Sequence, residues 1–129
     1  MLTRHNPDAI APTFSAYSHG VEVAPGARWL HISGQVGVLP DGGMADGPVG
    51  QMEQTWSNVL AVLAGAGMGP HDLVKVTAFV TRPEDVPLFR QVRDSLLEGA
   101  QPASTLVIVS GLAHPDWLVE IEAIAASVK

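Results

Sequence analysis

The sequence predicts an α+β fold in which two helices cover one face of a sheet of five to six strands, in the order β-β-(β)-α-β-α-β-β. Two segments repeat their apolar residues with the period of an amphipathic helix, and several others alternate apolar and polar residues as strands do. Gly and Pro separate these segments. The 129 residues contain no linker or internal repeat, so we expect a single domain over residues 1–129.

The first part of the chain has the pattern of strands. A strand over residues 14–23 ends at Pro25-Gly26, a turn signal of hairpin length, and a second strand covers residues 28–33. Residues 34–39 extend or follow that strand, and a Gly in such a place often marks a bulge or a close backbone approach. Residues 40–48 are rich in Gly and Pro and predict a loop.

Two segments predict helices. The first covers residues 50–66 and is stopped by three Gly residues and a Pro. Its apolar stripe, at spacings typical of one helix face, consists of Met52, Trp56, Val59, Leu60 and Leu63. The second helix has Asp85 as its candidate N-cap and Gly99 as its expected C-terminal cap.

Three further strands are expected at residues 72–81, 105–109 and 118–126. The continuous apolar run of residues 105–109 is typical of a strand buried on both faces. Because two helices cover only one face of the sheet, alternation leaves a mixed polar and apolar set on the other face. This set, which suits a subunit interface or a site, consists of Lys75, Thr77, Phe79, Glu120 and Glu122.

The composition narrows the class of protein. Charged residues make up 16% of the chain, below the roughly 25% of typical soluble domains, so we expect a partner chain to cover part of the surface. The net charge of −6 and the lack of any basic run argue against a nucleic-acid partner. No segment reaches the ~18 apolar residues of a membrane span. We expect a cytoplasmic protein without a membrane partner.

The spacing of the acidic residues and histidines indicates which chemistry the chain can support. Glu120 and Glu122 lie on the same strand face about 7 Å apart, which suits an acid–base pair, a solvated face, or a pairing with Lys75. The five His residues have no metal-ligand spacing, Cys is absent, and no phosphate-binding Gly pattern occurs. We therefore expect no metal site and no nucleotide cofactor.

The ordered set of short segments resembles the RidA family, also called the YjgF or L-PSP endoribonuclease-like family. The resemblance covers about residues 11–126 and rests on residues 16–18, Ser33-Gly34-Gln35, Gln51 with Asn58, residues 73–80, Glu84-Asp85, Pro102-Ala103 and residues 119–125. It implies a chorismate-mutase-like fold that assembles as a homotrimer with small-molecule pockets at the subunit interfaces. It also implies hydrolysis of reactive imines and enamines without metal or organic cofactor.

The resemblance implies roles for individual residues. Tyr17 matches the pocket tyrosine, Ser33 and Gly34 match the backbone that lines the pocket, and Glu120 matches the glutamate that positions or activates water. A further candidate for substrate binding is Thr105.

This chain departs from the pattern of the family's deaminases at two places. Ser104 stands where they carry an arginine that clamps the substrate carboxylate. A Ser side chain provides neither the positive charge nor the bidentate geometry of that contact. Arg90 stands where they usually carry Asn, and it either returns a cation to the pocket or lies along the helix surface.

Three functions follow from these observations. The first is a divergent Rid-type hydrolase or deaminase that acts on a small imine, enamine or related metabolite. The alternative is a non-catalytic trimer that binds a small molecule or a partner protein in the same cleft. The family's older labels, endoribonuclease and translation inhibitor, form a third, against which the net charge of −6 counts.

Overall fold

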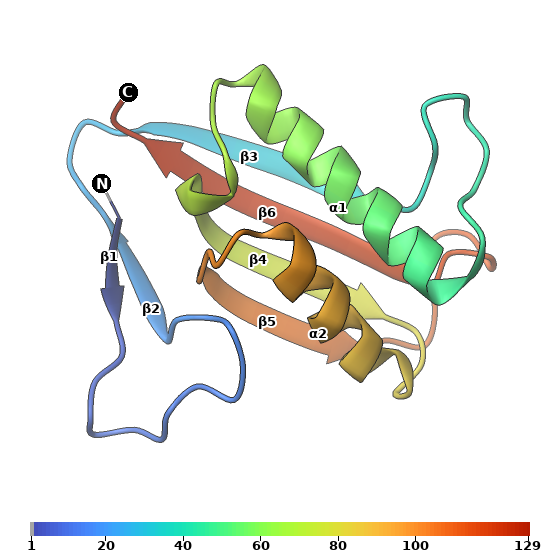
Figure 1. Cartoon of the computed structure of the whole chain (residues 1–129), viewed down its shortest axis with the longest axis horizontal. Helices are drawn as coiled ribbons and strands as arrows, with labels where there is room; N and C mark the ends of the chain where they lie inside the picture. The colour runs from blue at the N-terminus through green and yellow to red at the C-terminus, as the bar shows by residue number, and fades with distance from the viewer. Residues whose placement is uncertain (1) are drawn as a thin grey trace.

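The computed structural model describes residues 2–129 and confirms the α+β class (Figure 1). Its six strands form two sheets, an antiparallel pair of β1 and β2 and a four-stranded sheet in the order β3-β6-β4-β5, instead of one sheet of five to six strands. The elements are β1 (Leu2–His5), β2 (Gly20–Val23), β3 (Arg28–Gln35), α1 (Gly47–Gly65), the 3-10 turn η1 (Pro70–Asp72), β4 (Leu73–Val80), α2 (Asp85–Leu96), β5 (Ala103–Ile108) and β6 (Val119–Ser127).

Both helices lie on the same face of the four-stranded sheet (Figure 1), as the sequence predicts. The core fills the space between them and that face. Trp56 of α1 and Phe89 of α2 are fully buried, with ring centroids 6.1 Å apart. The inward residues of β4 and β6 complete the core: Val76, Ala78, Val80, Val119, Ile121, Ala123 and Ala125.

The other face of the four-stranded sheet carries no helix (Figure 1). Its residues on β4 and β6 are the mixed set that alternation predicts: Lys75, Thr77, Phe79 and Glu120 are half-buried and Glu122 is exposed. Trp29 of β3 adds a large apolar side chain that is 54% exposed. We call this surface the open face.

The predicted first strand is wrong over its first half. Residues 14–19 form no strand, because their backbone is held by the segment before β5: the Ser18 amide donates to Pro102 O at 3.0 Å and the Ser18 hydroxyl to Gln101 O at 2.6 Å. Only β2 remains, and it pairs with β1, a strand that the sequence analysis missed. Four residues are too short a window for alternation to indicate a strand.

β5 lies at an edge of the sheet, where β4 is the strand that it pairs with, and its first residue, Ala103, forms an isolated parallel bridge with Ser18. The prediction that this run is buried on both faces is therefore wrong for the single chain, in which Ile108 is 51% exposed. An apolar run indicates burial without indicating which partner provides it.

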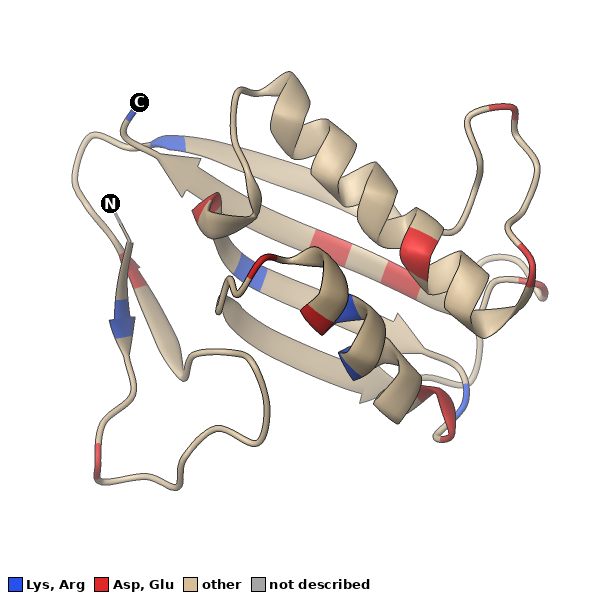
Figure 2. Cartoon of the chain, in the orientation of Figure 1, with Lys and Arg blue, Asp and Glu red and all other residues tan. Residues whose placement is uncertain are grey.

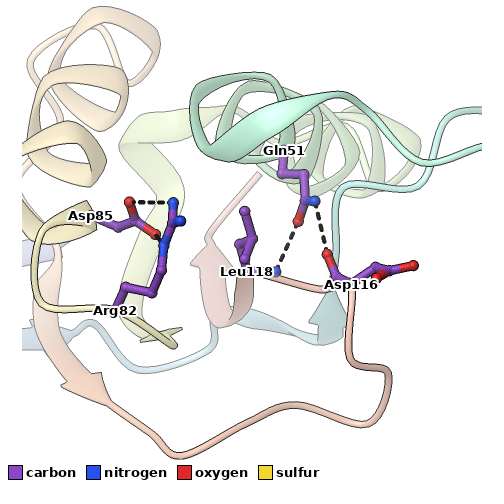
Figure 3. A network of polar contacts seen from close by, with 5 residues as sticks. All are labelled: Gln51, Arg82, Asp85, Asp116 and Leu118. Carbon is purple, nitrogen blue, oxygen red and sulfur yellow. Dashed lines mark hydrogen bonds and ion pairs between the residues drawn. The ribbon is translucent and has the colours of Figure 1, made fainter.

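The start of α2 also differs from the prediction, since the N-cap is Glu84 and Asp85 is the first helical residue. Asp85 is buried and accepts two hydrogen bonds from Arg82, from Nε at 2.9 Å and from Nη2 at 3.0 Å (Figure 3). These hydrogen bonds raise the pKa of Arg82 above its ordinary value. The bidentate pair fixes the first turn of α2.

Within residues 2–129, no helix is long and apolar enough to span a membrane.

Gly37 allows the segment after β3 to pack directly on α1. A Cβ added at Gly37 would lie 2.8 Å from Gln51 Cα, which is backbone that cannot move aside cheaply. We expect Gly37→Ala to lower the free energy of unfolding by about 1–3 kcal/mol, the usual cost of overpacking. Urea denaturation followed by far-UV circular dichroism measures this change. Unchanged stability would show that α1 and this segment move apart freely.

Candidate functional site

Two groups of the predicted site residues come together in the chain, and the first lies on β3 and β6. The register between these strands shifts between Ile32 and Gln35, at Ser33 and Gly34. A Cβ added at Gly34 would overlap the Glu120 carboxylate, so that carboxylate lies directly against the Gly34 backbone. The expected bulge and close approach are confirmed. We call Ser33, Gly34 and Glu120 the glutamate cluster.

Polar side chains of α1 fix both strands of this cluster. Buried Gln51 donates from Nε2 to Asp116 O at 3.0 Å and accepts from the Leu118 amide at 2.9 Å (Figure 3), which positions the chain just before β6. Asn58 Nδ2 donates to the carbonyls of Val36 and Val38, both at 3.0 Å. Sequence reasoning assigned these two side chains no role.

The second group lines a hollow of about 170 Å³ between residues 14–17, α2 and β5. Three predicted residues meet there, namely Tyr17, Arg90 and Ser104. The Tyr17 hydroxyl accepts a 3.4 Å hydrogen bond from the Phe14 amide. The hollow is completed by residues that sequence reasoning did not single out: Phe14, Ser15, Arg93 and Leu106. We call this the arginine hollow.

Arg93 is the unexpected member of the arginine hollow. It is only 5% exposed, and its Nε donates to Asp94 Oδ1 at 3.1 Å. Its Nη2 lies 3.0 Å from the same oxygen but makes no hydrogen bond to residues 2–129. The sequence did hold a signal, since Arg93 follows Phe89 by four positions and thus lies on the buried stripe of the second helix.

The glutamate cluster and the arginine hollow lie on opposite faces of the sheet. Ser104 pairs with Val76, whose side chain is in the core under the helices, whereas Glu120 pairs with Phe79 of the open face. They are also two strands apart, because β4 lies between β5 and β6. A small ligand cannot contact both groups within one chain.

Thr105 belongs to neither group. It lies on the open face, where its hydroxyl accepts a 2.7 Å hydrogen bond from Lys75 Nζ. Lys75 and Glu122 also line a shallow hollow of about 160 Å³ on that face. Of the alternatives that the sequence left open for the two glutamates, a pairing with Lys75 is not seen, because Lys75 Nζ donates to Thr105 instead. Within residues 2–129, no cluster of three or more His, Cys, Asp or Glu side chains has the geometry of a metal site.

The comparison with known proteins agrees with this architecture. The family model described as Endoribonuclease L-PSP matches residues 4–127. The chain belongs to this family, which includes RidA and YjgF. It is 33% identical to the 2-iminobutanoate/2-iminopropanoate deaminase of Mus musculus over 125 residues, which cover 95% of this chain and 87% of the mouse protein.

Solved structures of Rid proteins have the same fold. A Rid family protein of unknown function from Yersinia pestis, YyfB, superposes with a TM-score of 0.88 at 32% identity, with 98% of each chain covered. RidA from an Antarctic Psychrobacter superposes with a TM-score of 0.72 at 30% identity, covering 93% of this chain and 95% of that one. Relatives named as imine deaminases support a Rid-type function at the level of the family.

Proposed function

We propose that this Rid protein is a hydrolase that deaminates a small imine or enamine at a site built from two subunits. The observation that carries the proposal is the glutamate cluster: a half-buried carboxylate held against the Gly34 backbone by two elements that α1 fixes. The mouse relative is named for the deamination of 2-iminobutanoate and 2-iminopropanoate, which is the same reaction class.

In the proposed reaction, Glu120 accepts a proton from water while the water oxygen bonds to the C=N carbon. Glu120 passes this proton to the nitrogen as its π bond to carbon breaks, which gives a neutral carbinolamine. Glu120 then takes the hydroxyl proton as the C=O bond forms, and the amino group receives that proton and leaves as ammonia. The sum is imine plus water to carbonyl compound plus ammonia, a general acid–base reaction. Tyr17 and the backbone at Gly34 orient the substrate.

The site needs two copies of the chain, because the arginine hollow and the glutamate cluster lie on opposite sheet faces. The open face, with Trp29 54% exposed, and the edge strand β5, with Ile108 51% exposed, offer apolar surface for such an interface. A head-to-tail contact between these two unlike surfaces forms a ring when the rotation that relates neighbouring subunits closes, and an open filament when it does not. We propose that the ring is a homotrimer.

The oligomeric state is the first prediction from this assembly. Size exclusion coupled to light scattering at micromolar concentration is expected to give three times 13.5 kDa. Because the proposed interface includes the exposed apolar side chains of Trp29 and Ile108, we expect the trimer to persist at high salt. A stable monomer would contradict both the trimer and the two-subunit site.

The substrate preference follows from Ser104. The resemblance places a carboxylate-clamping arginine at this position, and a hydrogen bond to a charged group contributes about 1.5–3 kcal/mol. We therefore expect 2-iminopropanoate to be hydrolysed about 10²-fold more slowly than by the mouse deaminase, since each 1.4 kcal/mol is a factor of about ten in rate.

An oxidase-coupled assay of ammonia release, with imines generated in situ from a panel of amino acids, tests the proposal. We expect at least one imine to be hydrolysed faster than in buffer alone. A rate equal to that of the mouse enzyme on 2-iminopropanoate would contradict the role given to Ser104. No acceleration for any imine would favour the alternative of a binding protein without catalysis.

A further inference from the structure

A further hollow, of about 460 Å³, lies at the end of the sheet where β6 finishes. The residues that line it come from β1, η1 and the end of the chain, and include Leu2, Arg4, His71, Asp72, Val128 and Lys129. We call it the basic hollow. We infer that it is a second binding site, which takes a small organic anion: a carboxylate or phosphate group attached to a short apolar body.

The basic hollow is separate from the site proposed for imine hydrolysis. Glu120 is the second residue of β6, whereas Ser127 is its last residue and lines the basic hollow. The seven residue steps between them span about 23 Å at the usual rise of about 3.3 Å per residue. The basic hollow also shares no lining residue with the arginine hollow. A ligand bound there would not contact Glu120, so the inference does not depend on the proposed reaction.

The pairing of β1 with β2 directs positive charge toward the basic hollow. Leu2 and Arg4 are two residues apart and therefore lie on the same face of β1, and both line the hollow. His5 lies on the other face, where its imidazole and the Glu22 carboxylate are 2.8 Å apart. The acidic residue of this strand pair thus faces away from Arg4 and does not neutralise it.

The cations of the basic hollow are available to a ligand. Arg4 donates from Nε to Gln101 O at 3.3 Å, which leaves its terminal nitrogens as the two-pronged fork that binds carboxylates and phosphates. Within residues 2–129, neither Arg4 nor Lys129 forms a side-chain ion pair. The main-chain oxygen of Lys129 accepts a 2.6 Å hydrogen bond from Arg28 Nε. Negative charge at that backbone group is therefore paired with Arg28.

This end of the molecule differs in charge from the chain as a whole. The net charge is −6, and the sequence contains only seven Lys and Arg residues. Figure 2 shows blue segments on β1, at the start of β3 and beside the C-terminal end, all at the same end of the molecule. Asp72 adds one acidic group, whose Oδ2 accepts a 2.9 Å hydrogen bond from the Gly69 amide. A hollow lined mainly by charges of one sign concentrates ligands of the opposite sign.

The other walls set the size of the ligand. Leu2, Ala126 and Val128 provide apolar surface, and the His71 imidazole adds a polar group. The volume of about 460 Å³ lies within the roughly 300–1,000 Å³ of small-molecule sites. An inorganic ion would leave most of this space unfilled, whereas an apolar body attached to the anionic group would cover Leu2 and Val128. The hollow therefore suits an organic anion.

Isothermal titration calorimetry of the intact protein with phenyl phosphate, benzoate and benzyl alcohol tests the inference. The first two probes carry the two kinds of anionic group, and the third has a similar ring without charge. We expect at least one anion to bind saturably, and benzyl alcohol to bind about tenfold more weakly or not at all. The anion that binds more tightly identifies whether phosphate or carboxylate is preferred.

Variants locate the bound anion. We expect Arg4→Gln to weaken its binding about tenfold and Lys129→Gln several-fold, because each loses a charge-assisted contact. Arg4→Lys keeps the charge and should recover part of the affinity. Arg90→Gln, which removes the same charge from the arginine hollow, is the matched control and should change the affinity less than twofold. Because Arg4 is exposed, its variants should unfold at the same temperature as the wild type.

The outcomes separate this inference from the proposed function. It is wrong if neither anion binds, or if Arg4→Gln and Lys129→Gln both bind the anion as the wild type does. Loss of binding in Arg90→Gln alone would place the anion in the arginine hollow and also contradict the inference. Anion binding that needs Arg4, in a protein that hydrolyses no imine, would uphold the basic hollow and contradict the hydrolase. Imine hydrolysis without any anion binding in the basic hollow would do the reverse.

Discussion

Glu120→Gln is expected to lower imine turnover by about 10²–10⁴-fold, the range typical of a lost general acid or base. The amide keeps the size of the side chain but accepts no proton from water. Glu122→Gln is the matched control, because Glu122 lies two residues along the same strand face and is exposed. It lacks the contact with Gly34 that Glu120 makes. We expect it to change turnover less than threefold, because Glu122 does not lie against the Gly34 backbone.

Steady-state ammonia release, measured on the imine that the wild-type protein hydrolyses fastest, compares the two variants. Light scattering on the same samples verifies that both remain assembled. Loss of turnover in Glu122→Gln alone would reverse the assignment. Full activity in both variants would remove acid–base catalysis by this strand from the mechanism.

Gly34→Ala is expected to lower imine turnover strongly, as Glu120→Gln does, while leaving the protein folded. The new methyl group would occupy the place of the Glu120 carboxylate. That carboxylate is the far end of a flexible side chain, so it swings aside at small cost in stability. Its distance from the reacting water then increases, and small displacements at a reacting centre can cost about 10²-fold in rate.

Thermal unfolding and turnover of Gly34→Ala and Gly37→Ala, measured side by side, check this expectation. A Cβ at Gly37 meets the backbone of Gln51, whereas a Cβ at Gly34 meets a side-chain end. We therefore expect the first variant to lose stability and the second to lose activity. An active Gly34→Ala protein would show that the contact between Gly34 and Glu120 is not needed for the reaction.

The fold was largely predictable from periodicity. The stripe of Trp56, Val59 and Leu63 indicates α1, and all three residues are buried against the sheet. Alternation on β4 and β6 correctly separates the core face from the open face. The division into two sheets was not predictable, because it depends on the bonds of Ser18 to Gln101 and Pro102, more than 80 residues away. Local patterns carry no information about such distant partners.

The candidate site was predictable in its members but not in its arrangement. The resemblance indicated Tyr17, Gly34 and Glu120, yet no pattern of residues indicates that Tyr17 and Glu120 lie on opposite sides of the sheet. Arg93 was overlooked because a charged residue is normally assigned to the surface from sequence, and only the structure reveals that Arg93 is buried. Gln51 and Asn58 act through backbone groups of distant segments, which sequence spacing does not reveal.

Subunit mixing tests the two-subunit site most directly. Glu120→Gln and Tyr17→Phe are each expected to be nearly inactive, since one lacks the carboxylate of the glutamate cluster and the other the hydroxyl of the arginine hollow. When equal amounts are unfolded together and refolded, every mixed ring contains one junction with both groups intact, and about a quarter of the wild-type activity should return. Native mass spectrometry verifies that mixed trimers form. Mixed trimers as inactive as their parents would contradict a site shared between subunits.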